Sequence, residues 1–322
     1  MIWKNIKIAS IVPLLLSNCS QGHNQIKASS SQSKAVSEMV SLVTTEVKSF
    51  SNRHYYSVDF DNSNSGCQLE ILLNDVPVAR KIEINGTITS SSPINSCILG
   101  SGKQKLKIKL YPNLGKTNFT TSAKNTSPIT LSISDRKNAW DDQDMTEVKI
   151  FKLPAIIVDE SLTYVEKEFD FEAEVPYQFQ GWSMSKNLTS IPDIERKVKD
   201  KYKEIKGLLE AKDYNAFAKI KKQKDAEMNT SFFLRPDEIK QGDVFDREAF
   251  TEKDAEVLPF DNVKVAFYGY GKLVALENIS DKGSALRTKI KHVSSGGKVN
   301  EEVIKFPILL HMPQNSDKLE II

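Results

Sequence analysis

The sequence reads GKQKLKIKLY over residues 102–111, and polar and apolar side chains alternate along it. The apolar positions are Leu106, Ile108 and Leu110, and the lysines between and before them are Lys105, Lys107 and Lys109. Successive side chains of a β-strand point to opposite faces of its sheet. The stretch therefore predicts a strand with one face in a core and the other in water, as is common in antiparallel sheets.

Shorter stretches with strand character lie on both sides of this one. They cover residues 54–60, 67–73, 78–84, 129–134 and 146–151. Turn signals such as Asn74-Asp75 and Asn85-Gly86 separate them. Short strands with frequent turns are typical of a β-sandwich, so we expect a sandwich domain over residues 51–153.

Part of this region resembles the jelly-roll and immunoglobulin-like accessory modules of larger proteins. The resemblance lies in LLNDVPV at residues 72–78, PIN at residues 93–95 and GSGKQKLKI at residues 100–108. In those modules a strand ends in an asparagine and a turn, and a later glycine-rich turn opens a long alternating strand. The resemblance implies an immunoglobulin-like or jelly-roll β-sandwich and no particular ligand.

The second half of the chain begins with helical periodicity. Apolar residues recur three or four positions apart at Ile191, Ile194, Val198, Tyr202, Ile205 and Leu209. This spacing predicts an amphipathic helix, and Asp213 is a suitable N-cap for a second helix that runs to Met228. After Pro259 strand patterns return, with a hairpin at Gly269-Tyr270-Gly271. We expect an α+β domain over residues 154–322, with a helix pair and an antiparallel sheet, and the α+β class for the whole chain.

The first nineteen residues carry the most specific motif. Lys4 and Lys7 precede an apolar run over residues 8–16, and the run ends in LSNC at residues 16–19. A positive start and a short apolar run are typical of a secretory signal, and about nine residues are too few to span a bilayer. LSNC resembles the lipobox of bacterial lipoproteins, in which a peptidase cuts before the cysteine and the thiol carries a diacylglycerol. The resemblance implies a signal peptide over residues 1–18 and lipidation of Cys19.

A lipoprotein of this kind lies at the outer membrane or elsewhere in the cell envelope, facing the periplasm or the cell surface. The body also resembles envelope lipoproteins with a β-sandwich domain. Residues 19–50 are expected to form a tether, rich in Ser, Gln, Asn and Lys at its start, with a short helix or a lead-in strand after Val36. The expected partners are the membrane, through the lipid, and an envelope protein. An ordinary cleaved signal peptide with secretion is the alternative.

Cysteine usage agrees with export. With Cys19 lipidated, Cys67 and Cys97 remain, and an even remainder in an oxidising compartment suggests one disulfide between them. The alternative is a pair of buried thiols on neighbouring strands, because the sequence does not fix the distance between the two Cα atoms.

Motifs for catalysis are missing from the sequence. It contains no Gly-x-Ser-x-Gly, His-Glu-x-x-His or Cys-x-x-Cys. Asp170, Glu172 and Glu174 occupy alternate positions of one predicted strand. They either supply paired carboxylates for acid–base catalysis or form the solvent-exposed face of the strand. The net charge of +2 and the export signal disfavour a nucleic-acid partner. We expect no enzyme, no cofactor and no metal.

Aromatic residues supply the candidate contact surface. It comprises Tyr268, Tyr270 and Trp182, because exposed Tyr and Trp favour contacts with proteins or carbohydrates. Tyr270 is the best candidate for exposure, since it lies between two glycines in a predicted turn. We therefore predict a non-catalytic lipoprotein that binds a protein at the envelope. The alternatives are a surface protein that binds a glycan or small ligand, and an enzyme of unrecognised type.

Overall fold

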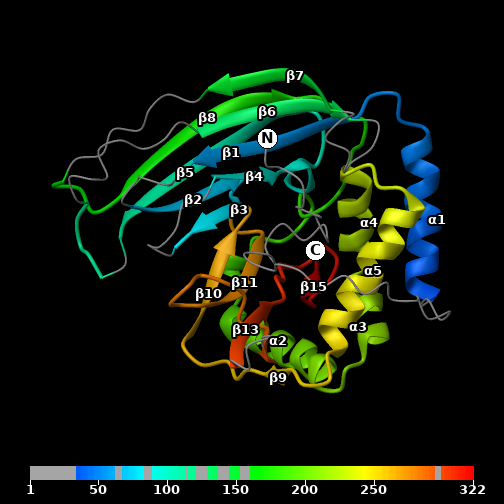
Figure 1. The fold of residues 1–322 in the computed structure, drawn as a ribbon, viewed down its shortest axis with the longest axis vertical. Helices are drawn as coiled ribbons and strands as arrows, with labels where there is room; N and C mark the ends of the chain where they lie inside the picture. The colour runs from blue at the N-terminus through cyan, green and yellow to red at the C-terminus, as the bar shows by residue number, and fades with distance from the viewer. Residues whose placement is uncertain are drawn as a thin grey trace.

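The computed structural model describes residues 34–61, 67–82, 89–113, 115–119, 129–136, 145–152, 160–293 and 299–322. The predicted signal peptide, Cys19 and the predicted tether as far as residue 33 lie outside these ranges. Within them, the chain forms helices and four antiparallel sheets, which confirms the α+β class (Figure 1). None of the helices in these ranges has the length and apolar character that crossing a bilayer requires.

Two four-stranded sheets occupy one end of the molecule (Figure 1). The first has the order β4-β1-β6-β7, with β1 at His54–Asp61, β4 at Thr89–Pro93, β6 at Ile129–Arg136 and β7 at Met145–Lys152. The second has the order β3-β2-β5-β8, with β2 at Cys67–Leu73, β3 at Val76–Lys81, β5 at Gly102–Pro112 and β8 at Val165–Ala173. The strand predicted from residues 102–111 is thus confirmed.

The two sheets share one core. Leu106 and Ile108 of β5 are fully buried, as is Val58 of β1. The ring of Tyr56 on β1 lies 6.1 Å from the ring of Phe171 on β8, and its hydroxyl bonds the backbone of Glu174. Apolar side chains of both sheets therefore belong to one core, while the β-sandwich, immunoglobulin-like or jelly-roll, stays a prediction.

The N-terminal sheet extends beyond the predicted domain boundary at residue 153. Strand β8 pairs with β5 along its length, from Gly102 opposite Ala173 to Leu110 opposite Val165. A boundary drawn after residue 153 would remove an edge strand from its sheet. Local composition does not reveal this pairing, because the two strands lie about sixty residues apart in sequence.

Helix α1 (Lys34–Lys48) belongs to the body rather than to the tether. It packs along α4 (Lys222–Ser231) and α5 (Pro236–Thr251). Its buried side chains belong to the same core as the two sheets and are Val36, Met39, Val43 and Val47. Of the two predictions for residues 36–50, the helix is confirmed.

The predicted helix pair is present in modified form. Helix α2 (Ile194–Glu210) buries the predicted face, although Asp193, with φ 56°, precedes it without a side-chain cap. Asp213 caps α3 (Tyr214–Ile220) as expected, by accepting a hydrogen bond from the Ala216 amide. The second predicted helix divides at Lys221 into α3 and α4.

Two smaller sheets complete the molecule. One has the order β10-β11-β14-β15, formed by Val263–Tyr268, Leu273–Asn278, Leu310–His311 and Glu320–Ile321. The other has the order β13-β12-β9, formed by Val299–Lys305, Arg287–Val293 and Glu256–Val257. The apolar stretch at residues 303–312 is divided between the two sheets, because β13 ends at Lys305 and β14 joins the other sheet.

Candidate functional site

The turn between β10 and β11 is fixed by backbone hydrogen bonds. Gly269, Tyr270 and Gly271 have φ angles of 56°, 58° and 83°, values that residues other than glycine rarely adopt. The Gly269 amide donates to the Asp75 carbonyl at 3.0 Å, and the Tyr270 amide donates to the Asp75 carboxylate at 2.9 Å. Asp75 lies in the β2–β3 turn, so each turn holds the other in place.

A second segment supports the turn from its other side. A Cβ atom on Gly269 would lie 3.2 Å from the Trp182 ring, and one on Gly271 would lie 2.8 Å from the Asn187 side chain. The Gly271 carbonyl accepts a hydrogen bond from the Leu188 amide at 2.8 Å. The structure thus brings half-buried Trp182 to the turn, and Tyr270 projects from it with 57% of its surface exposed.

Tyr268 does not belong to this surface. It is 9% exposed, and its hydroxyl donates to Glu277 at 2.7 Å while it accepts from Arg80. Tyr268 ends β10, and its contact with Arg80 on β3 places its side chain against the N-terminal sheet, whereas Tyr270 lies in the turn beyond the strand. The prediction that Tyr268 contributes to a binding patch is therefore wrong.

Tyr268 is part of a buried ionic network that sequence reasoning missed. Arg80 on β3 bonds Glu70 on β2 at 2.6 Å and Glu277 on β11 at 2.9 Å. Burial alone would raise the pKa of Glu70, but the charges of Arg80 and Lys282 outweigh it and lower that pKa. The network joins the N-terminal sheet to the C-terminal hairpin. Its members lie too far apart in sequence to form a motif.

Beside Tyr270, charged side chains form rows on β5 and β8. Lys103 pairs with Asp170 and Lys105 pairs with Glu168, both at 2.8 Å. Asp170 and Glu172 thus lie opposite lysine-bearing β5, as expected for the wet face of a strand. The Tyr270 phenol is close enough to be influenced by these rows: burial and the charge of Asp75 raise its pKa, and the lysines oppose the shift.

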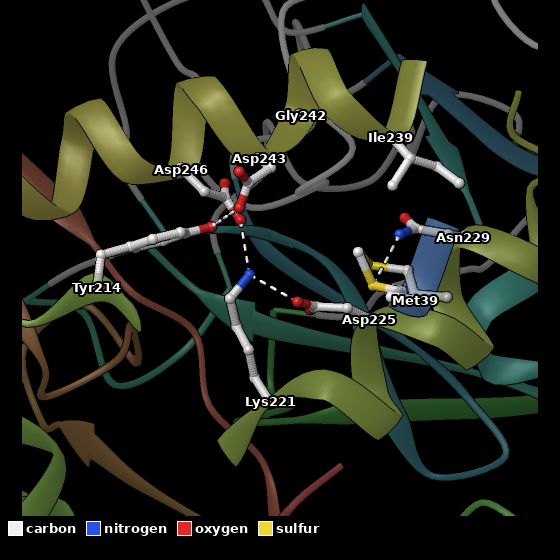
Figure 2. Close-up of a pocket in the computed structure, with 10 residues that line it drawn as sticks. Met39, Tyr214, Lys221, Asp225, Asn229, Ile239, Gly242, Asp243 and Asp246 are labelled. Atoms are coloured by element: carbon white, nitrogen blue, oxygen red, sulfur yellow. Dashed lines mark hydrogen bonds and ion pairs between the residues drawn. The ribbon is translucent and has the colours of Figure 1, made fainter. Parts of the chain in front are cut away.

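A small polar cavity lies beneath α1 (Figure 2). Its volume of about 30 Å³ accommodates about one water molecule. Lys221 reaches into it and contacts Asp225 at 2.7 Å and Asp246 at 2.9 Å (Figure 2). Burial alone would lower the pKa of Lys221, but these two carboxylates raise it, so the amine stays charged.

The remaining polar groups at this cavity are also paired. The Tyr214 hydroxyl donates to Asp243 at 2.8 Å, and Asn229 contacts the Met39 sulfur at 3.5 Å (Figure 2). The described residues contain no group of three or more His, Cys, Asp or Glu side chains arranged to hold a metal. Ion pairs and hydrogen bonds together thus join α1, α3, α4 and α5 around the cavity.

An open groove of about 580 Å³ lies along the start of α2. Acidic and basic side chains alternate in its lining, which includes Asp193, Glu195, Arg196 and Lys199. Charges of both signs give the groove no preference for a cation or an anion.

The structure contradicts the predicted disulfide. Cys67 and Cys97 are both buried and form no disulfide with each other. Cys67 begins β2, whereas the Cys97 carbonyl accepts a hydrogen bond from Asn74, just after the other end of that strand. The length of β2 therefore separates the two cysteines by about 20 Å, far beyond the reach of about 6 Å between bridged Cα atoms. Cys97 also lies in the 3-10 helix η1 (Asn95–Cys97) rather than in a strand, and burial raises its pKa to about 12.

Comparison with known proteins places the chain in no family. No family model matches it, and searches of curated proteins and of solved structures also return no match.

Proposed function

We propose that the chain is an exported, lipid-anchored binding protein of the bacterial cell envelope without a catalytic role. The observation that carries the proposal is the LSNC motif at residues 16–19, which follows a positive start and a short apolar run. A diacylglycerol on Cys19, with further acylation of the new N-terminus, would attach the protein stably to the membrane. A single acyl chain binds a membrane only weakly and reversibly, whereas several chains bind it stably.

The spacing between Cys19 and the body suits a tether. About fifteen residues separate Cys19 from the start of α1 at Lys34. A chain of this length reaches at most about 50 Å when extended and roughly 20 Å on average when flexible. The body would therefore stay near the membrane while remaining free to turn toward a ligand.

The geometry of the body favours binding over catalysis. The charged groups at the cavity beneath α1 are paired with one another, and the cavity accommodates about one water. By contrast, the Tyr270 turn presents an exposed aromatic ring on a backbone fixed from two sides. An aromatic side chain on a fixed backbone loses little conformational entropy when it binds.

The anchor is tested by intact mass and membrane partition in bacteria. The wild type is expected to lose residues 1–18, gain the mass of the lipid and sediment with membranes. Cys19→Ala should remain uncut and carry no lipid, whereas Cys67→Ala, a matched change at a buried thiol, should be processed like the wild type. Cleavage elsewhere with release of the wild type would refute the anchor.

A further inference from the structure

The outer face of the sheet β3-β2-β5-β8 is divided into a covered and an open half. Over β2 and β3, the hairpin β10–β11 covers Glu70 and Arg80, whose side chains are 8% and 12% exposed. Over β5 and β8 the face is more open, because Lys103 is 67% exposed and Lys105 and Glu168 are each 39% exposed. Lys107 and Lys109 are 16% and 22% exposed, so the open part lies mainly at Lys103 and Lys105. We call this open half the β5–β8 strip. It consists of Lys103, Lys105, Lys107, Lys109, Glu166, Glu168, Asp170 and Glu172.

The strip has no net charge. Its four lysines on β5 face four carboxylates on β8, and the pairs include Lys107–Glu168 at 3.2 Å. A charged ligand therefore gains no overall attraction. The strip does offer donors and acceptors in alternating rows, repeated about every 7 Å along each strand. A ligand that matches it must itself carry many groups able to donate and accept hydrogen bonds.

Exposed tyrosines border the strip. Tyr270, 57% exposed, lies at its side near Lys105 and Lys107. Tyr164, 39% exposed, lies at its end, donates to Glu166 and contacts the Tyr111 ring at a centroid distance of 5.2 Å. A tyrosine ring combines an apolar face with a polar tip. The ligand should therefore carry apolar faces as well as hydroxyls.

We propose that the β5–β8 strip, with Tyr270 and Tyr164, binds a neutral polysaccharide chain. A pyranose ring has hydroxyls around its rim, which match the paired lysines and carboxylates, and apolar C–H faces, which match the tyrosine rings. For a polyanion, repulsion by the four carboxylates would offset attraction by the four lysines. The inference rests on the proposed binding role and supplies its ligand class.

The test uses the mature lipidated protein in detergent and three neutral tetrasaccharides: cellotetraose, maltotetraose and the tetramer of N-acetylglucosamine. At least one is expected to bind with a Kd below about 5 mM by titration calorimetry. Tyr270→Ala should weaken that binding by at least about tenfold. Phe267→Ala, a matched change at a 37% exposed ring on the same hairpin, should leave it unchanged.

Salt dependence separates a neutral from a charged ligand. The affinity should change by less than about twofold between about 0.05 M and 0.5 M NaCl. Lys105→Met, which removes a donor of the strip, should weaken binding, and circular dichroism checks that each variant is folded.

Failure to bind any of the three sugars at about 10 mM, or wild-type affinity in Tyr270→Ala, would overturn the proposal. Capture of an envelope protein by a photoreactive residue at position 270, without sugar binding, would assign the surface to a protein instead. The lipid mass assay reports on the anchor independently, so loss of the anchor and loss of the sugar site are distinguishable.

Discussion

Arg80 illustrates how one buried side chain fixes the relation between two parts of the chain. Its guanidinium bonds Glu70 in the N-terminal sheet, and Glu277 and Tyr268 in the C-terminal hairpin. Burial alone would lower its pKa, but the charge of Glu277 and the other acceptors outweighs burial and raises it. This cation therefore lies between two buried carboxylates and is the partner that they share.

Replacing Arg80 should be costly. Arg80→Ala leaves Glu70 and Glu277 buried without their shared partner, and such a loss lowers the free energy of unfolding by about 3–5 kcal/mol. Arg196→Ala is the matched control, because Arg196 is 66% exposed and pairs with Asp200 on the surface, where a pair contributes about 0–1 kcal/mol. Urea unfolding of both variants measures the difference. Equal effects would show that the network adds nothing beyond a surface pair.

Asp281 predicts a loss of stability in acid. Burial alone would raise its pKa, but hydrogen bonds from Arg287, Lys305 and the Gly283 amide lower it to about 2. Because the folded value is below the unfolded value of about 3.9, the contribution is present above pH 4 and is lost as the pH falls toward 2. After allowance for solvent screening it amounts to about 1 kcal/mol.

Asp281→Asn should remove this part of the pH dependence. The stability difference between wild type and variant, measured by urea unfolding between pH 6 and pH 2.5, should shrink as the pH falls. Asp254→Asn, at an exposed position, should show a constant difference. A constant difference for Asp281→Asn as well would contradict the assigned ion pairs.

At the scale of elements, α1 allows a sharp test of whether this helix packs into the core, because a buried and an exposed apolar residue are adjacent in its sequence. Val43 is fully buried, whereas Leu42 is 51% exposed. Val43→Ala should lower the free energy of unfolding by about 2 kcal/mol, since it removes two buried carbons and leaves a cavity. Leu42→Ala should change it by less than about 0.5 kcal/mol. A small effect of Val43→Ala would mean that α1 belongs to the tether and not to the body.

Elements with a regular apolar period were predictable, and those with buried polar residues were not. Helix α2 buries Val198, Tyr202 and Ile205 at the spacing visible in its sequence. Helix α4 instead buries Asp225, Asn229, Thr230 and Ser231. Lys221 pairs with Asp225, Met39 of α1 accepts from Asn229, and Ser231 bonds a carbonyl of its own helix. No period therefore marks where α3 ends and α4 begins. Strand β4, with the sequence TSSSP, is likewise visible only through its pairing with β1.

In the candidate site, too, features with a local sequence signal were predictable, and those that depend on distant residues were not. Exposure of Tyr270 followed from its two flanking glycines, a local signal. The burial of Tyr268 did not, because its partner Arg80 lies 188 residues away in sequence. The pairing of the lysines on β5 with the carboxylates on β8 required the long-range register of those strands, although the alternation of each strand was evident by itself.

At the scale of the whole molecule, the two predicted domains share their interior. Tyr268 and Leu273 of the C-terminal hairpin belong to the same core as the N-terminal sheets. Tyr55 of β1 donates a hydrogen bond to the Phe232 carbonyl after α4. Together with the Arg80 network, these contacts join the two halves of the chain. A second cluster of buried side chains, which includes Val198 and Leu276, comes only from residues 188–321. The first cluster is nevertheless incomplete without the C-terminal half, whereas independent domains each have a complete core of their own.

The chain should therefore unfold as one unit. Hydrogen exchange of amides in β5 and in α2 is expected to report the same global free energy, and heat or urea should give one transition by every probe. A chain truncated after residue 153 should not fold, because it lacks β8 and exposes the edge of β5 that hydrogen-bonds to β8 in the intact sheet. The matched control is the full chain nicked by protease between residues 153 and 159, which retains β8 and should keep its structure. Two separate transitions, or a folded fragment ending at residue 153, would show that the shared core contributes little and that the domain boundary predicted from composition is the physical one.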